Sequence, residues 1–270
     1  MKMARTDFRS AANAQLYILA QWALPVLIIA LWEVLSVAGA IPPRVLPAPS
    51  AVITAGWKLT LSGELPRNMW VSFWRAVVGL AIGGGFGFAL GLVNGLSRRA
   101  ETISDSTIQM VRNIPHLALI PLVILWFGID ETAKIFLVAL GVFFPIYLNT
   151  QHGIRTVDPK LVEMGRSYGM SAWTLFWQVL LPGALPSIFI GLRYALGIMW
   201  LTLIVAETIA ASAGVGYMAM QAREFLLVDV VVLSILIYAL LGKLADSIAR
   251  LLERRCLAWH PALQVAENKP

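Results

Sequence analysis

Long apolar stretches alternate with shorter polar segments along most of this chain. Six of them stand out, at residues 16–38, 70–92, 108–127, 133–149, 188–210 and 230–249. Each is close to the ~20 residues that an α-helix needs to cross the hydrocarbon core of a bilayer. The pattern predicts an all-α membrane protein with about six transmembrane helices. We place them in one membrane domain, 16–255, between an N-terminal segment, 1–15, and a C-terminal tail, 256–270.

The third stretch differs from the others because polar residues and prolines interrupt it. These residues are Arg112, Asn113, Pro115, His116 and Pro121. A helix broken at membrane depth leaves backbone groups that must be satisfied by protein or by a water-filled cavity. We therefore expect this segment to pack against other helices or to line a path.

The second stretch has a glycine at every fourth position, namely Gly79, Gly83, Gly87, Gly91 and Gly95. This spacing keeps successive glycines near one helical face, where a second backbone can approach closely. Two alternatives follow: tight packing inside one subunit, or a sliding or subunit–subunit contact that lets helices shift between states.

A polar segment at 158–186 separates the fourth and fifth stretches. Asp158 is a good N-cap for a short helix, and Gly169 suits a left-handed helix stop. Ser171 can cap a second short helix, which we expect Pro182 to end. The result is a helix–Gly–helix elbow at a membrane face, a shape that can transmit motion from a soluble partner into the membrane.

A shorter amphipathic segment lies between the first two stretches, after the proline-rich residues 42–49. Ser50 is placed to cap a helix at the membrane interface, with Trp57 as its anchor.

The composition agrees with a membrane protein. Hydrophobic residues make up 59% of the chain and charged residues 13%, with a net charge of +6. A soluble domain carries about 25% charged residues, so the excess apolar surface must face lipid. The positive charge raises the alternative of nucleic-acid binding, but its distribution is better explained by the orientation of the chain in a membrane. The single Cys256 excludes an internal disulfide.

The basic residues indicate that both termini are cytoplasmic. With the N-terminus inside, six spans return the C-terminus to the same side. Twelve basic residues then face the cytoplasm: Lys2, Arg5, Arg9, Arg98, Arg99, Arg155, Lys160, Arg166, Arg250, Arg254, Arg255 and Lys269. Five face the other side: Arg44, Lys58, Arg67, Lys134 and Arg223. This asymmetry follows the positive-inside rule and places the elbow in the cytoplasm.

Polar and aromatic residues at membrane depth are candidates for a translocation path. Arg112 and His116 are one helical turn apart, and they either line a path for an anion or serve packing. Glu207 is a gate residue, the partner of a basic group or a structural hydrogen-bond acceptor. Trp200 belongs to an aromatic belt or contacts substrate, and we expect Arg75 to extend toward the outer interface.

Several catalytic motifs are missing from the sequence. It has no GxxxxGK[ST] phosphate loop, no HExxH, no GxSxG and no cysteine pair. We therefore expect no catalytic residues, no metal site and no cofactor on this chain.

The elbow resembles the cytoplasmic signature loop of ABC-importer permeases. The resemblance rests on the spacing of Glu163, Gly169, Phe176, Val179, Leu181 and Pro182. The family pattern begins Glu-Ala-Ala, whereas this chain reads Glu163-Met164-Gly165. The wider sequence, roughly 46–253, resembles the aliphatic-sulfonate, taurine and nitrate group. Segments 112–130 and 196–207 are most similar to the sulfonate branch.

The resemblance implies a type I ABC-importer permease of the bacterial inner membrane, with a coupling helix in the loop at about 153–186. Its partners would be cytoplasmic ABC ATPases carrying ATP and Mg²⁺, an extracytoplasmic solute-binding protein and a second permease subunit in a homodimer. Aliphatic sulfonates are the implied substrate, with taurine, nitrate or bicarbonate as alternatives. The rival class is a secondary transporter that works without ATP. The residues that would contact the ATPase are Glu163, Met164, Gly165, Arg166, Gly169, Phe176, Leu181 and Pro182.

Overall fold

The computed structural model describes residues 23–259, and every regular element in that range is helical. After an N-terminal apolar helix, Ala23–Val37, the order is α2 (Pro49–Leu61), α3 (Glu64–Leu96), α4 (Arg98–Arg112), η1 (His116–Leu119), α5 (Ile120–Phe127), α6 (Glu131–Arg155), α7 (Pro159–Ser167), α8 (Ala172–Leu175), η2 (Phe176–Leu180), α9 (Leu181–Ala210), α10 (Val215–Glu224) and α11 (Val228–Cys256). The predicted segment 1–15, the start of the first span and residues 260–270 of the tail lie outside the described residues.

Four described helices are long and apolar enough to cross a bilayer: Glu64–Leu96, Glu131–Arg155, Ala172–Ile209 and Val228–Cys256. A fifth crossing results if α4 and the η1–α5 segment count as one bent span. The helix Ala23–Val37 belongs to the first predicted span. The all-α prediction is confirmed for the described residues, and a count of about six spans is approximate.

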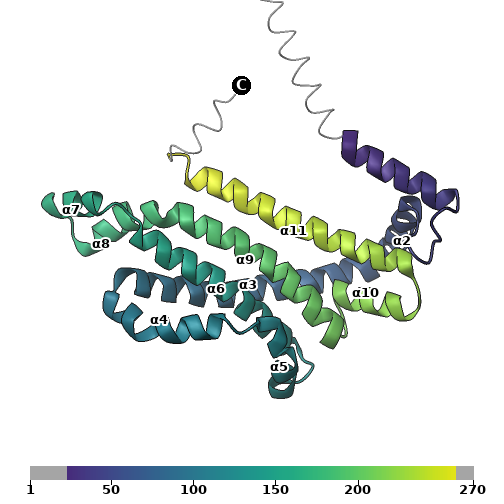
Figure 1. The fold of residues 1–270 in the computed structure, drawn as a ribbon, viewed down its shortest axis with the longest axis horizontal. Coiled ribbons are helices and arrows are strands. Elements are labelled where there is room, and N and C mark those ends of the chain that lie inside the picture. The colour runs from purple at the N-terminus through teal and green to yellow at the C-terminus, as the bar shows by residue number, and fades with distance from the viewer. Residues whose placement is uncertain (1–22, 260–270) are drawn as a thin grey trace, which may run out of the picture.

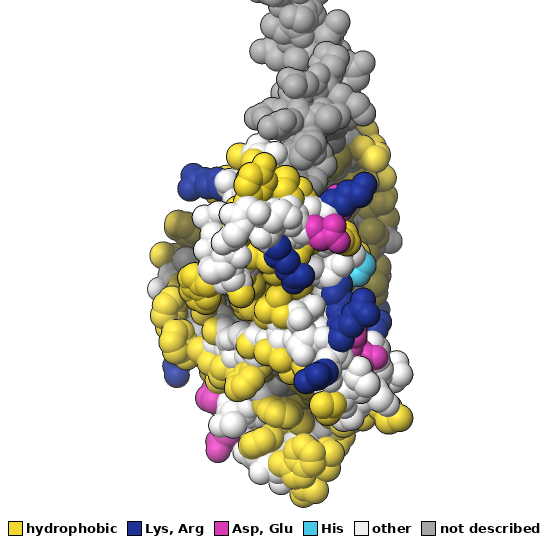
Figure 2. Space-filling model, turned by 90° about the vertical axis from the view of Figure 1, so that its left-hand side faces the viewer, with side chains coloured by type: hydrophobic (Ala, Val, Ile, Leu, Met, Phe, Trp, Pro, Cys, Tyr) yellow, Lys and Arg dark blue, Asp and Glu magenta, His cyan; other side chains and the backbone are white. Residues whose placement is uncertain are grey.

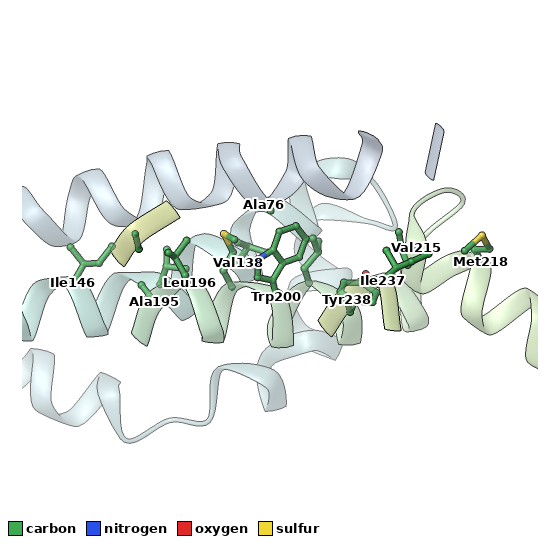
Figure 3. Close-up of a cluster of buried hydrophobic side chains, with 14 of the residues drawn as sticks. Ala76, Val138, Ile146, Ala195, Leu196, Trp200, Val215, Met218, Ile237 and Tyr238 are labelled. Atoms are coloured by element: carbon green, nitrogen blue, oxygen red, sulfur yellow. The ribbon is translucent and has the colours of Figure 1, made fainter. Parts of the chain in front are cut away.

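The core forms where α3, α6 and α9 run alongside one another, with α10 and α11 closing one side (Figure 1). Figure 3 shows the buried side chains of this cluster, in which Ala76 of α3 and Val138 of α6 meet Trp200 of α9 and Tyr238 of α11. A T-shaped contact joins Trp200 and Tyr238, whose ring centroids are 6.2 Å apart.

The glycine stripe of α3 faces α6. A Cβ atom on Gly83 would overlap the backbone of Ala139, and one on Gly87 would lie 2.6 Å from the carbonyl oxygen of Phe143. One on Gly91 would lie 2.7 Å from the carbonyl oxygen of Tyr147. In this structure the stripe therefore serves close packing inside one subunit, the first of the two alternatives.

The third predicted stretch, 108–127, is not one helix. α4 ends at Arg112, and the chain bends by 76° before it continues as η1 and α5. Pro115 explains the break, because proline has no N–H and disfavours helical geometry in the residue before it.

Pro182 does not end the second helix of the elbow, contrary to the prediction. The chain stays helical from Ala172 to Ile209. The π-helical segment η2 lies directly before Pro182, and the N–H of Leu181 donates to the carbonyl oxygen of Phe176. A π-turn re-satisfies backbone groups that a proline would leave unpaired in an α-helix.

Ser50 does not cap α2, whose N-cap is Ala48. Its hydroxyl and its N–H instead donate to the Glu33 carboxylate at 2.7 and 3.0 Å and tie α2 to the N-terminal helix. Trp57 on α2 is exposed, as an interfacial anchor would be.

The helices place different segments of the chain at the two ends of the molecule. The α3–α4 turn, the elbow of α7 and α8, and the C-terminal end of α11 lie at one end, whereas α2 and α10 lie at the other (Figure 1). The first end therefore carries eight basic residues that were predicted to share a side: Arg98, Arg99, Arg155, Lys160, Arg166, Arg250, Arg254 and Arg255. The other four of that predicted set lie outside the described residues.

Candidate functional site

The elbow begins as its capping residues predict. One Asp158 carboxylate oxygen accepts a hydrogen bond from the N–H of Lys160 at 2.9 Å. The helix α7 ends at Ser167, and Gly169 has a φ of +75°, in the left-handed region. The N–H of Met170 then donates to the carbonyl oxygen of Gly165 at 3.1 Å, which closes the helix end.

The second helix of the elbow folds back on the first. The Ser171 hydroxyl accepts from the N–H of Thr174 and caps α8. Gly165 is buried in the fold, where an added Cβ would lie 2.6 Å from Cδ1 of Leu175 and 3.2 Å from the sulfur of Met170. A small residue at this position therefore suits the close packing of the two elbow helices, and a Cβ would require the Leu175 side chain to shift.

The outward face of the elbow is available to a partner. Glu163, Met164 and Arg166 are exposed, and Met164 keeps 51% of its surface accessible. Figure 2 looks onto this end and shows Lys and Arg side chains spread among exposed hydrophobic ones. Phe176 packs against Trp173 and Trp177, with ring centroids 6.5 and 5.3 Å away. Leu181 and Pro182 are half-buried at the start of α9.

A second polar site lies at the opposite end of the three core helices, and we call it the Arg75 cluster: Arg75, Glu131, Lys134, Glu207, Ser72 and Tyr238. Arg75 is 1% exposed, so the prediction that it extends to the interface is wrong. Its Nε and Nη2 atoms donate to the two oxygens of Glu131 at 2.6 and 2.5 Å. Its Nη1 donates to Glu207 at 2.7 Å. Burying a guanidinium at membrane depth requires such partners.

The Glu207 carboxylate accepts hydrogen bonds from several parts of the cluster. It accepts from Ser72 and Tyr238 at 2.8 Å, as well as from Arg75 and the N–H of Gly216. Of the three alternatives raised by the sequence, the structure therefore supports a partner of a basic group that also serves as a hydrogen-bond acceptor.

The same cluster holds the loop between α9 and α10. Arg75 donates to the carbonyl oxygen of Ala213, and Asn68 and Ser72 accept from the N–H groups of Gly214 and Val215. Gly214 has a φ of +117°, and an added Cβ would meet the Glu207 carboxylate. A glycine is required here for both reasons.

Arg112 and His116 do not share a helical face. Arg112 is exposed in the last turn of α4 and donates to Gln109 at 3.3 Å. His116 begins η1 beyond the Pro115 break, and its Nε2 lies 2.9 Å from Oγ1 of Thr202 on α9. The break at Pro115 therefore separates the two residues, and their role in a translocation path stays a prediction.

Trp200 lies in the core, with 7% of its surface exposed, so this structure does not present it to a substrate. The indole N–H has no hydrogen-bond partner among the described residues.

Glu131 and Lys134 were not predicted as members of this site. Glu131 opens α6, and Lys134 was assigned to the outer surface, yet Lys134 is 2% exposed. Its Nζ donates to the carbonyl oxygens of Ile129 and Asp130 at 2.9 and 3.2 Å. The only usable signal was the requirement that a buried arginine find a carboxylate.

Comparison with known proteins gives matches over most of the chain. Residues 81–257 match the family model described as "Binding-protein-dependent transport system inner membrane component". The aliphatic sulfonates transport permease protein SsuC of Escherichia coli is 62% identical over 92% of this chain and 94% of its own length. SsuC of Bacillus subtilis is 48% identical, over 87% of this chain and 86% of its own length. The taurine transport system permease protein TauC of Escherichia coli is 36% identical, over 88% of both chains.

Solved structures share the fold. A chain in the crystal structure of an amino acid ABC transporter with histidines superposes with a TM-score of 0.59 at 20% identity, covering 75% of this chain and 96% of its own. This likeness confirms the predicted fold of an ABC-importer permease.

Proposed function

Because the chain belongs to the family of binding-protein-dependent transport system inner membrane components, we propose that it is the permease subunit through which an ATP-driven importer moves aliphatic sulfonates. The observation that carries this proposal is the 62% identity to SsuC of Escherichia coli over 92% of the chain. Identity to the taurine permease is 36%, which favours aliphatic sulfonates over taurine.

In this proposal two copies of the chain form the path in a bacterial inner membrane. Two cytoplasmic ATPases, which carry ATP and Mg²⁺, lie against the elbows, and an extracytoplasmic solute-binding protein delivers the substrate. Both termini face the cytoplasm. The gathering of basic residues at the elbow end supports this orientation.

The elbow would couple the ATPase to the path because helices of the core continue directly from it. α6 ends at Arg155, just before the elbow, and α9 continues from α8 and η2 without a break in helical structure. When ATP binding draws the ATPases together, pressure on Glu163 to Gly169 would tilt α6 and α9. The cavity between two subunits would then open outward, and hydrolysis would reset it.

The residues of the elbow would play different parts in this coupling. Glu163 and Arg166 make polar contacts with the ATPase, and exposed Met164 adds an apolar contact. Gly165 allows the two helices to pack, Gly169 supplies the bend, and Phe176 anchors the elbow through its aromatic neighbours. Leu181 and Pro182 join the elbow to α9.

A secondary transporter is the rival. Such proteins commonly use a pair of broken helices related by inverted symmetry. The described residues contain one bent pair, α4 with η1–α5.

The test is affinity purification of the detergent-solubilised chain from its native membrane, followed by mass spectrometry. We expect a P-loop ATPase to co-purify, and the charge reversal Glu163→Lys to remove it. Glu224→Lys is the matched control, because Glu224 is also exposed but lies on α10 at the opposite end. A chain that purifies alone and moves ethanesulfonate into liposomes without ATP would instead be a secondary transporter.

A further inference from the structure

We propose that Arg75 and Lys134 form a binding site for the substrate's sulfonate group, and that the Glu131 carboxylate occupies this site until the substrate displaces it. This inference rests on the proposed function, since it assigns a contact to the transported anion. It concerns the Arg75 cluster, which the elbow mechanism does not use.

The two carboxylates that neutralise the cluster are held very differently. Glu207 has no exposed side-chain surface and is fixed by Ser72, Tyr238 and a backbone N–H in addition to Arg75. The side chain of Glu131 is 57% exposed, and its contacts within the cluster are with Arg75 and Lys134. Glu131 is therefore the carboxylate that can leave by a side-chain rotation, while Glu207 stays.

The position that Glu131 would vacate has the geometry of an oxyanion site. Nε and Nη2 of Arg75 bind its two oxygens at 2.6 and 2.5 Å, a fork that also fits two oxygens of a sulfonate. Nζ of Lys134 lies 3.8 Å from one of these oxygens. Two backbone carbonyls already hold this ammonium, which has three N–H groups, so one remains for an anion.

The charge of the emptied site matches a monoanion. Arg75 and Lys134 contribute two positive charges and Glu207 one negative charge, so the three residues that remain carry +1. An alkanesulfonate is a permanent monoanion, and exchanging it for Glu131 leaves the cluster neutral. Little electrostatic cost then accompanies the exchange, apart from the desolvation of the incoming anion.

The place of the site suits the first contact of an imported solute. The cluster lies at the opposite end of α3 and α6 from the elbow, beside the loop 211–214 and the start of α6. In the proposed orientation this is the outer end, where the solute-binding protein releases its cargo.

The test measures binding of radiolabelled ethanesulfonate to the purified full-length chain in lipid nanodiscs. Glu131→Gln keeps the shape of the side chain but removes the competing negative charge. We expect the variant to bind about tenfold more tightly than the natural chain, and adding Lys134→Met to reverse the gain. Glu101→Gln is the control, because Glu101 also pairs with an arginine, Arg155 at 2.5 Å, but at the elbow end.

Equal binding by Glu131→Gln and the natural chain, with unchanged thermal unfolding, would overturn the site, as would an equal gain in Glu101→Gln. ATP-driven ethanesulfonate uptake by the natural chain with its partners is measured separately. Uptake without any gain in Glu131→Gln removes this inference and leaves the proposed function standing. A gain without uptake supports the anion site and removes the proposed substrate.

Discussion

At the scale of single residues, the ion pair of Arg75 and Glu207 stands out because the two side chains are only 1% and 0% exposed. Removing one member of a buried pair usually costs about 3–5 kcal/mol. Without Glu207, Arg75 would keep only the 57% exposed Glu131 as a carboxylate partner. The side chains of the Glu101–Arg155 pair, in contrast, are 26% and 32% exposed, so water solvates both charges in part. Pairs of that kind contribute about 0–1 kcal/mol.

Glu207→Gln should therefore lower the free energy of unfolding by about 3 kcal/mol. Gln has nearly the same shape but removes the charge of the buried one of the two carboxylates that pair with Arg75. Glu101→Gln should change it by about 1 kcal/mol or less. Denaturant unfolding of both variants in detergent, followed by tryptophan fluorescence, measures the difference. Similar losses in the two variants would mean that the buried pair contributes no more than the exposed one.

The Arg75 cluster was predicted only in part from the sequence. Glu207 was a candidate because an acidic residue at membrane depth requires a partner. Its partner could not be identified from the sequence, because Arg75 is 132 positions from Glu207 and 56 from Glu131. Contacts of that separation depend on how the helices pack, which a single sequence does not specify. The predicted shared face of Arg112 and His116 was wrong for a local reason, because Pro115 breaks the helix between them.

At the scale of elements, the α3–α6 contact depends on backbone approach. A Cβ on Gly83 would meet the main chain of Ala139, which cannot move without separating the two helices. Gly83→Ala should destabilise the protein by about 2 kcal/mol, within the usual cost of overpacking. Gly85 is exposed on the same helix with nothing within 4 Å, so Gly85→Ala should be neutral or stabilising. Midpoints of thermal unfolding compare the two, and equal midpoints would contradict close packing at Gly83.

The elbow gives a second prediction at this scale. Gly169 has a φ of +75°, and its N–H donates to the carbonyl oxygen of Arg166. Proline cannot adopt this φ and has no N–H. Gly169→Pro should therefore abolish assembly with the ATPase or coupled transport, while the chain still inserts into the membrane. Gly169→Asn is the control, since asparagine tolerates left-handed geometry. Normal ATP-dependent uptake by the proline variant would contradict the role of the elbow.

The elbow was largely predictable because caps and stops act over a few residues. The Asp158 and Ser171 caps and the Gly169 stop all appear as expected. The π-turn before Pro182 was not predictable. The chain stays helical through this proline from Ala172 to Ile209, although proline by itself tends to end a helix.

At the scale of the whole molecule, the length of the apolar runs predicted the spanning helices, and the distribution of basic residues predicted the orientation. Runs of apolar residues located α3, α6, α9 and α11, because the bilayer fixes the length of a spanning helix. The boundaries were too narrow, since α3 begins at Glu64 and extends to Leu96. The ends of a long helix are polar, so hydropathy alone does not include them.

The proposed orientation can be tested with the chain's own cysteine. Cys256 is exposed at the C-terminal end of α11, at the same end as the elbow (Figure 1). If that end is cytoplasmic, a membrane-impermeant maleimide should label Cys256 in inside-out vesicles and leave it unlabelled in intact spheroplasts. Lys58→Cys combined with Cys256→Ser places the thiol on exposed α2, at the other end, and should reverse the pattern.

The two labelling patterns together separate three situations. Opposite patterns for the two thiols, with Cys256 inside, support the orientation in which the elbow meets a cytoplasmic ATPase. Opposite patterns with Cys256 outside would place the elbow and its basic residues beyond the reach of any ATPase, contrary to the positive-inside rule. Labelling of both thiols from one side would mean that α2 and the end of α11 do not lie across the membrane from each other. Because the elbow mechanism and the outer sulfonate site both depend on the first result, this measurement constrains the two proposals at once.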